Sequence, residues 1–186
     1  MTHFHRRLRY LLTLLGSSAL LAAAETRTEV VKATTPALDA KPLSPAVPDV
    51  YAIDAKFERV VILRFKHQTD LLEGLTRMVK EHKIRNAVIL SAIGSVRGYH
   101  YHVVSNRDFP SKNMFVKDPE TPADITGMSG YVIDGALHPH ITLSNDRHAF
   151  GGHLEPGTPV FTFAAITIGV LADGAKLQRL DDKTFR

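Results

Sequence analysis

The sequence predicts an α+β fold in which a mostly antiparallel β-sheet carries one main helix packed on it. Segments rich in β-branched residues recur along the chain, whereas only one segment has a helical spacing of apolar residues. The links between these segments are short, which favours antiparallel pairing. With 186 residues, 44% of them hydrophobic, the chain is long enough to bury the core of one domain.

The first folded elements are a strand and a helix. The stretch "FERVVILRFKH" (Phe57–His67) is rich in β-branched residues and predicts a strand. Thr69 or Asp70 can then cap a helix. Apolar residues recur after the cap at the spacing of one helical face: Leu71, Leu72, Leu75, Met78 and Val79.

The remaining elements are predicted to be strands. The stretch "RNAVILSAIGSVRGYHYHVV" predicts a buried strand, bends or bulges at Gly94 and Gly98, and an alternating continuation. Residues 105–125 are polar, contain three prolines and predict a long loop. Further strands are expected near Ile125–Ile133, Leu137–Ser144, His148–His153 and in "PVFTFAAITIGVLA".

The N-terminus has the pattern of a secretory signal peptide. Three arginines precede an apolar run from Tyr10 to Ala24, which closes on Ala22-Ala23-Ala24. We therefore expect cleavage near Ala24 and a periplasmic or secreted protein, exported by general secretion in preference to the twin-arginine route. The alternative is a membrane anchor, but the run is shorter than the roughly 20 residues that a spanning helix needs.

Composition sets the domain boundaries and excludes some partners. Residues 25–54 are rich in Ala, Pro and Thr and predict a flexible linker before a domain at 55–172 and a polar tail at 173–186. Beyond residue 24 the chain has 20 basic and 19 acidic residues, so no nucleic-acid partner is expected. The chain has no cysteine, which excludes disulfides and thiolate ligands.

The stretch "GALHPHITLSNDRHAFGGHL" contains four of the ten histidines. If its strands pair around a two-residue turn at Asn145-Asp146, His138 faces His153 and His140 faces Gly151. The three histidines then share one face of the sheet, and Gly151 leaves space over His140. Three imidazoles suit a first-row metal and leave one coordination position open. The alternative is a polar sheet face whose histidines form local hydrogen bonds.

Two further groups near this hairpin have possible roles. Glu155 is the candidate general base for a metal-bound water, although "EPG" is also typical of a turn. His100 and His102 lie on one face of a predicted strand, with Tyr99 and Tyr101 on the other. We expect these two histidines to lie at the surface or at an interface. The alternative is that they form a second metal site or support the first one.

The stretches "VILSAIGSVRG" and "MSGYVIDGALHPHITLSNDRHAFGGHLEPGTPVFTFAAITIG" closely resemble the PPC domain, the plants-and-prokaryotes conserved domain. The resemblance covers about residues 56–171. It implies an antiparallel sheet with flanking helices, assembly as a homotrimer, and a divalent metal, usually zinc, bound by His138, His140 and His153. The chain lacks the AT-hook of the plant members, so their DNA-binding role is not expected here.

Three functions remain open at this level. The metal and the clefts of a trimer could hold a small anionic ligand. The open metal position could instead support a hydrolase or a lyase. Thirdly, the protein could be a non-catalytic assembly protein without a functional metal. Glu155 is the only acid close behind the predicted ligands, and the lack of a second acid favours binding over catalysis.

Overall fold

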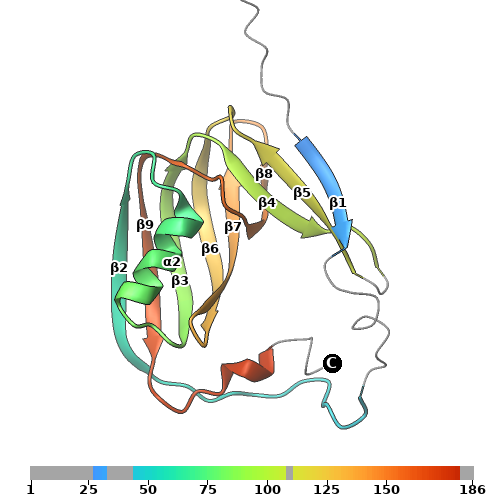
Figure 1. Cartoon of the computed structure of the whole chain (residues 1–186), viewed down its shortest axis with the longest axis vertical. Coiled ribbons are helices and arrows are strands. Elements are labelled where there is room, and N and C mark those ends of the chain that lie inside the picture. Colours follow the sequence, from blue (N-terminus) through green and yellow to red (C-terminus); the bar gives the residue numbers. More distant parts are fainter. Residues whose placement is uncertain (1–26, 33–43, 108–110, 181–186) are drawn as a thin grey trace, which may run out of the picture.

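The computed structural model describes residues 27–32, 44–107 and 111–180 (Figure 1). These residues form one antiparallel sheet of nine strands, in the order β1-β5-β4-β8-β7-β6-β3-β9-β2. The strands are β1 (Arg27–Lys32), β2 (Phe57–Lys66), β3 (Ala87–Val96), β4 (Tyr99–Val104), β5 (Lys112–Asp118), β6 (Ala123–Ile133), β7 (Ala136–Ser144), β8 (Ala149–Leu154) and β9 (Val160–Leu171). An α-helix, α2 (Leu71–Glu81), and a 3₁₀ turn, η1 (Leu177–Leu180), complete the described part.

The helix α2 lies against one face of the sheet, in front of β2, β9 and β3 (Figure 1). Asp70 caps it, because a side-chain oxygen accepts a hydrogen bond from the backbone N–H of Glu73 at 3.0 Å. Its apolar side, which includes Leu71, Leu75 and Val79, is buried. The predicted strand and capped helix are therefore present in the structure.

The face of the sheet that carries α2 forms the core. Side chains alternate between the faces of a strand, and Leu63 and Phe65 of β2 join Ile166 and Ile168 of β9 in the buried cluster. The same cluster continues to Tyr101 of β4. Thus one face of the curved sheet is apolar and buried from β2 to β4, and the opposite face, here called the outer face, is available for a site.

Two stretches predicted to be irregular contain strands instead. The polar segment 105–125 includes β5, which pairs with β4, and the linker segment 25–54 includes β1, which pairs with β5. Neither strand has a clear apolar alternation, so each owes its conformation to backbone pairing with its neighbour. The tail also contributes to packing, because Ala175 and Leu177 are buried.

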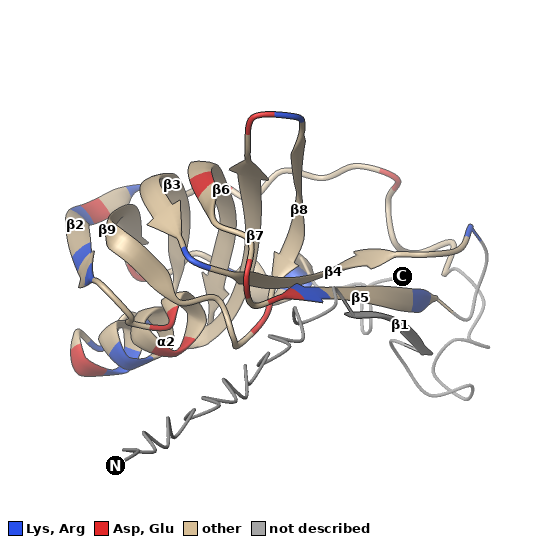
Figure 2. Cartoon of the chain, turned by 90° about the horizontal axis from the view of Figure 1, so that it is seen from above, with Lys and Arg blue, Asp and Glu red and all other residues tan. Residues whose placement is uncertain are grey.

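Charged residues of both signs are interspersed on α2 and β2 (Figure 2). The predicted signal peptide, residues 1–24, lies outside the described residues. In the parts of the chain that are described, no helix combines the length and apolar character that a bilayer crossing requires.

Candidate metal centre

The hairpin of β7 and β8 places the predicted histidines on the outer face. Its turn has four residues, Asn145 to His148, and the predicted two-residue turn is wrong. The side-chain oxygen of Asn145 accepts hydrogen bonds from the backbone N–H groups of Arg147 and His148, which stabilises the longer turn. His140 therefore pairs with His153, two residues away from the predicted register.

A shift of two residues preserves the face on which a side chain lies, because the side-chain period of a strand is two. His138, His140 and His153 consequently share the outer face although their predicted pairing was wrong. The ring centroids of His138 and His140 lie 5.0 Å and 5.7 Å from that of His153. The structure thus places the three predicted rings near one another on one face of the sheet.

The double glycine allows β8 to fit between its two neighbours. A Cβ atom on Gly151 would collide with the carbonyl oxygen of Ile141 on β7, and Gly151 also has a φ of +154°. A Cβ atom on Gly152 would collide with the carbonyl oxygen of His102 on β4. The prediction that Gly151 leaves space over His140 is wrong, since Gly151 pairs with Thr142.

A fourth histidine, His102, joins the group from β4. It pairs directly with His153, and the two rings stack at a centroid distance of 4.5 Å. His140, His153 and His102 therefore form a row across three adjacent strands. The signal in the sequence was the alternation of "YHYH", since Tyr99 and Tyr101 face the core and direct the histidines outward. The partner strand of β4 was not predictable from this pattern.

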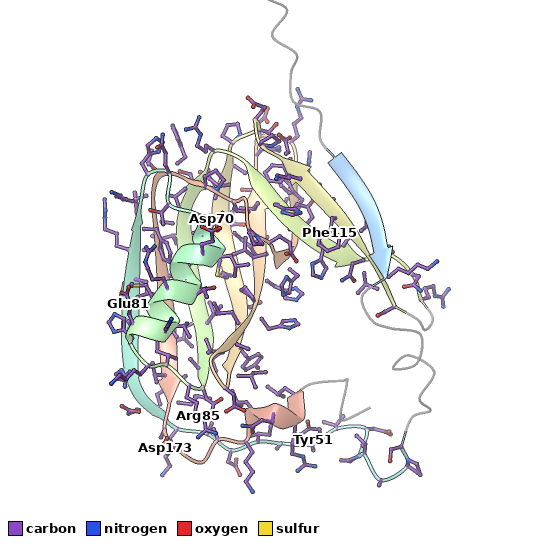
Figure 3. The ribbon with its side chains drawn as sticks, in the orientation of Figure 1. Tyr51, Asp70, Glu81, Arg85, Phe115 and Asp173 are labelled. Atoms are coloured by element: carbon purple, nitrogen blue, oxygen red, sulfur yellow. The ribbon has the colours of Figure 1, made fainter. Side chains whose placement is uncertain are left out.

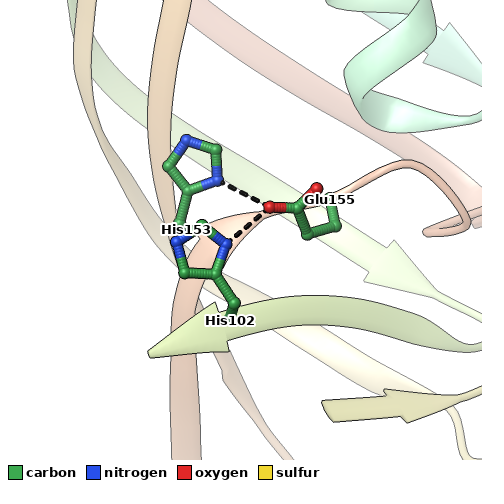
Figure 4. A group of neighbouring side chains, drawn as sticks. All are labelled: His102, His153 and Glu155. Carbon is green, nitrogen blue, oxygen red and sulfur yellow. Dashed lines mark hydrogen bonds and ion pairs between the residues drawn. The ribbon is translucent and has the colours of Figure 1, made fainter. Parts of the chain in front are cut away.

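Glu155 connects two members of the row (Figure 4). Its Oε1 atom lies 2.6 Å from Nδ1 of His102 and 3.2 Å from Nδ1 of His153. With the Glu155 oxygen as the acceptor, both Nδ1 atoms donate, which defines the tautomer of each ring. The Nε2 atom of a neutral ring in this tautomer has a free lone pair for a metal. The side chains of His102, His153 and Glu155 are only 18%, 20% and 19% exposed, respectively.

The environment favours neutral imidazoles. Burial, followed by the neighbouring His138 and His102, lowers the pKa of His140 below its ordinary value of 6.5. Burial and His102 likewise lower the pKa of His153, and Glu155 offsets part of this effect. Since a histidine must be neutral to bind a metal, the lowered pKa of His140 and His153 favours the metal-binding form of both rings.

The geometry of the ring nitrogens fits a metal centre. Two ligand nitrogens on a tetrahedral zinc ion are about 3.3–3.4 Å apart when each Zn–N distance is about 2.0–2.1 Å. The Nε2 atoms of His138 and His140 are 3.3 Å apart. Among the described residues, the group of three side chains whose ligand atoms all lie within 4.8 Å of one another is instead His102, His153 and Glu155. Of the three predicted ligands, that group contains His153 alone, so the described residues include a group that could hold a metal, and the set of His138, His140 and His153 stays a prediction.

Two other histidines lie apart from this arrangement. Nδ1 of His100 is 2.7 Å from the carbonyl oxygen of Pro156, so its ring holds the segment after β8. His148 is exposed in the hairpin turn, beside Phe150. His148 is therefore a suitable control for substitutions in the cluster.

Comparison with known proteins identifies the family. Residues 53–172 match the model of the Plants and Prokaryotes Conserved (PCC) domain, also called the PPC domain, and the chain belongs to this family. Its fold is that of a PPC protein from Pyrococcus horikoshii, with a TM-score of 0.56 at 19% identity over 68% of this chain and 87% of the other.

Other similar proteins broaden the comparison. A metal-containing protein from Archaeoglobus fulgidus has a TM-score of 0.55 at 22% identity, over 68% of this chain and 89% of that chain. A hypothetical protein from Salmonella has a TM-score of 0.53 at 21% identity, over 65% and 81%. The bifunctional protein GlmU from Synechococcus is 28% identical over 116 residues, which are 62% of this chain but only 17% of that protein's length.

Proposed function

We propose that this PPC-domain protein is exported and binds a divalent metal, zinc, through His138, His140 and His153, with a small anionic ligand at the open coordination position. The observation that carries the proposal is the 3.3 Å separation of the Nε2 atoms of His138 and His140, with the His153 ring centroid 5.0 Å and 5.7 Å from theirs. Export to the periplasm or the exterior is supported by the basic and apolar pattern of residues 1–24.

The side chains of the proposed site have two roles, metal binding and orientation of a ligand. β7 supplies His138 and His140, and β8 supplies His153. Glu155 accepts a hydrogen bond from Nδ1 of His153, which fixes the tautomer and the orientation of that ring. A divalent metal held by three neutral imidazoles supplies a Lewis-acidic position for an oxygen ligand.

Binding is favoured over catalysis by the position of Glu155. A general base must be free to take a proton from the reacting group, whereas the Oε1 atom of Glu155 is engaged by both His102 and His153. The group of possible ligands among the described residues contains no second acid. A hydrolase or lyase using Glu155 as a base is therefore the second candidate, and its distinguishing property is turnover of a bound ligand.

The proposal is tested by measuring zinc in the full chain purified without an affinity tag, followed by titration with zinc. We expect one zinc ion per chain and a loss of at least about tenfold in affinity for His138→Ala, His140→Ala and His153→Ala, since two imidazoles hold zinc less well than three. The control, His148→Ala, should bind zinc like the parent. If His153→Ala also binds zinc as tightly as the parent, the proposed site is wrong.

A further inference from the structure

An apolar hollow of about 980 Å³ lies beside the histidine cluster on the outer face. His138 and His140 form part of its wall, together with Val88, Tyr131, Leu137 and Leu180. The volume is at the upper end of the range for small-molecule sites, which are mostly apolar with a few convergent polar groups. The two imidazoles are such groups, so the hollow and the metal centre form one continuous site.

The far wall of this hollow comes from outside the PPC domain. Leu180 lies beyond residues 53–172, which match the family model. Three contacts hold its turn in place. Leu177 is 4% exposed and packs in a cluster with Val88. The Gln178 side chain donates to Oδ2 of Asp134 at 2.6 Å. The Arg179 guanidinium lies 4.8 Å from the ring centroid of Tyr51, a residue that Figure 3 labels.

The lining of the hollow favours a ligand with one charged group and an apolar body. Its lining residues include no Asp, Glu, Lys or Arg among the part of the chain that is described. The metal proposed beside the hollow is therefore the one position there that suits a charged group of a ligand. An oxygen anion is a suitable ligand for zinc.

We propose that the hollow binds a small monocarboxylic acid with an apolar body, whose carboxylate is held at the metal centre and whose body contacts Val88, Leu137 and Leu180. This inference rests on the proposed zinc site and adds the chemical class of its ligand. Leu180 limits the length of the apolar body. Because Leu180 lies outside residues 53–172, which match the family model, this length limit is a feature of this chain and not of the PPC domain.

The test is calorimetric titration of the zinc-loaded full chain with acetate, butyrate and hexanoate. Affinity should rise about two- to fourfold for each methylene that enters the hollow. Leu180→Ala should lower the affinity for hexanoate about fivefold or more, with zinc content and acetate affinity unchanged. Leu90→Ala is the matched control, because Leu90 and Leu180 are both 44% exposed and Leu90 does not line the hollow.

The outcomes separate the inference from the proposed function. If the chain binds zinc but the three carboxylates bind equally, or if Leu180→Ala behaves like Leu90→Ala, the inference is overturned and the zinc site stands. Equal binding of hexanoate to chelator-treated protein would overturn the role assigned to the metal. If titration with zinc alone detects no site, both proposals are overturned.

Discussion

At the scale of single residues, Glu155 has the most informative position. One carboxylate oxygen contacts Nδ1 of both His102 and His153, so the two rings are held in related orientations. Carboxylates in this position raise the basicity of a ligating histidine and fix its tautomer. The geometry supports an orienting role for this residue, whereas its sequence context "EPG" is typical of a turn.

Glu155→Gln should lower the zinc affinity by about 10–100-fold, as expected for loss of a carboxylate that supports a ligating histidine. The neutral amide is a weaker acceptor, so His153 loses much of its orientation. Zinc titration measures the effect, and Glu120→Gln, at an exposed position near β5, is the control. Unchanged affinity in Glu155→Gln would contradict the orienting role.

Tyr99 anchors the strand that carries His102. Its hydroxyl donates to Oδ2 of the buried Asp118 at 3.3 Å. Burial, with the charge and hydrogen bond of Asp118 as further causes, raises the pKa of Tyr99 from 10.0 to about 12. Between pH 10 and pH 12 the folded chain therefore retains a proton that the unfolded chain releases.

The free energy of unfolding should consequently fall as the pH rises from 10 to 12, and the Tyr99 contribution is fully present below pH 10. Tyr99→Phe removes the titrating hydroxyl. The free energy of unfolding of this variant should therefore fall less between pH 10 and pH 12. Urea unfolding at several pH values gives the comparison, and tyrosinate absorbance reports the titration. An identical pH dependence in the parent and in Tyr99→Phe would contradict the assignment.

At the scale of elements, β8 determines whether the site exists. It lies between β7 and β4 and aligns His153 with a histidine on each side. Its close approach to both neighbours depends on the absence of side chains at Gly151 and Gly152. The "GG" pair thus allows one row of imidazoles to extend across three strands.

Gly151→Ala should therefore lower the free energy of unfolding by about 2–4 kcal/mol, through backbone strain at a φ of +154° and a clash with the carbonyl of Ile141. Zinc binding should weaken as well, since β8 would move away from β7. The control is Gly127→Ala in β6, where a Cβ atom would meet nothing within 4 Å. Similar stabilities for the two variants would show that the close packing is not required.

At the scale of the whole molecule, an apolar patch remains on the outer face of β2, β3 and β9. Ile62, Ile93 and Phe163 are 72%, 60% and 42% exposed. In the strand pairing, Ile62 lies opposite Thr167 and Ile93 opposite Ala165, so these side chains are on the face away from α2. Apolar surface of this kind is typical of an interface.

We propose that this patch mediates a homotrimer, with the number of copies taken from the resemblance to the PPC family. Light scattering of the parent should give three chains, because a closed ring satisfies a heterologous contact. Ile62→Glu should reduce the mass toward that of one chain. Val104→Glu, at a position 67% exposed on β4, should not. A monomeric parent at micromolar concentration would contradict the trimer.

The sequence by itself determined the family, the capped helix and the shared face of His138, His140 and His153. The face was predictable because alternation along a strand has a period of two, and an error of two residues in the turn leaves it unchanged. The helix was predictable because its cap and its apolar spacing are local.

Only the tertiary structure decided which residues join the histidine cluster. His102 meets His153 because β4 pairs with β8 across about fifty residues of chain, and no local pattern encodes that partner. The strands β1 and β5 likewise exist through pairing with their neighbours. Leu180 lies in a tail that looks polar, yet it reaches the hollow because Leu177 is buried against the sheet. Strand partners and packed tails depend on long-range burial, which residue spacing alone does not specify.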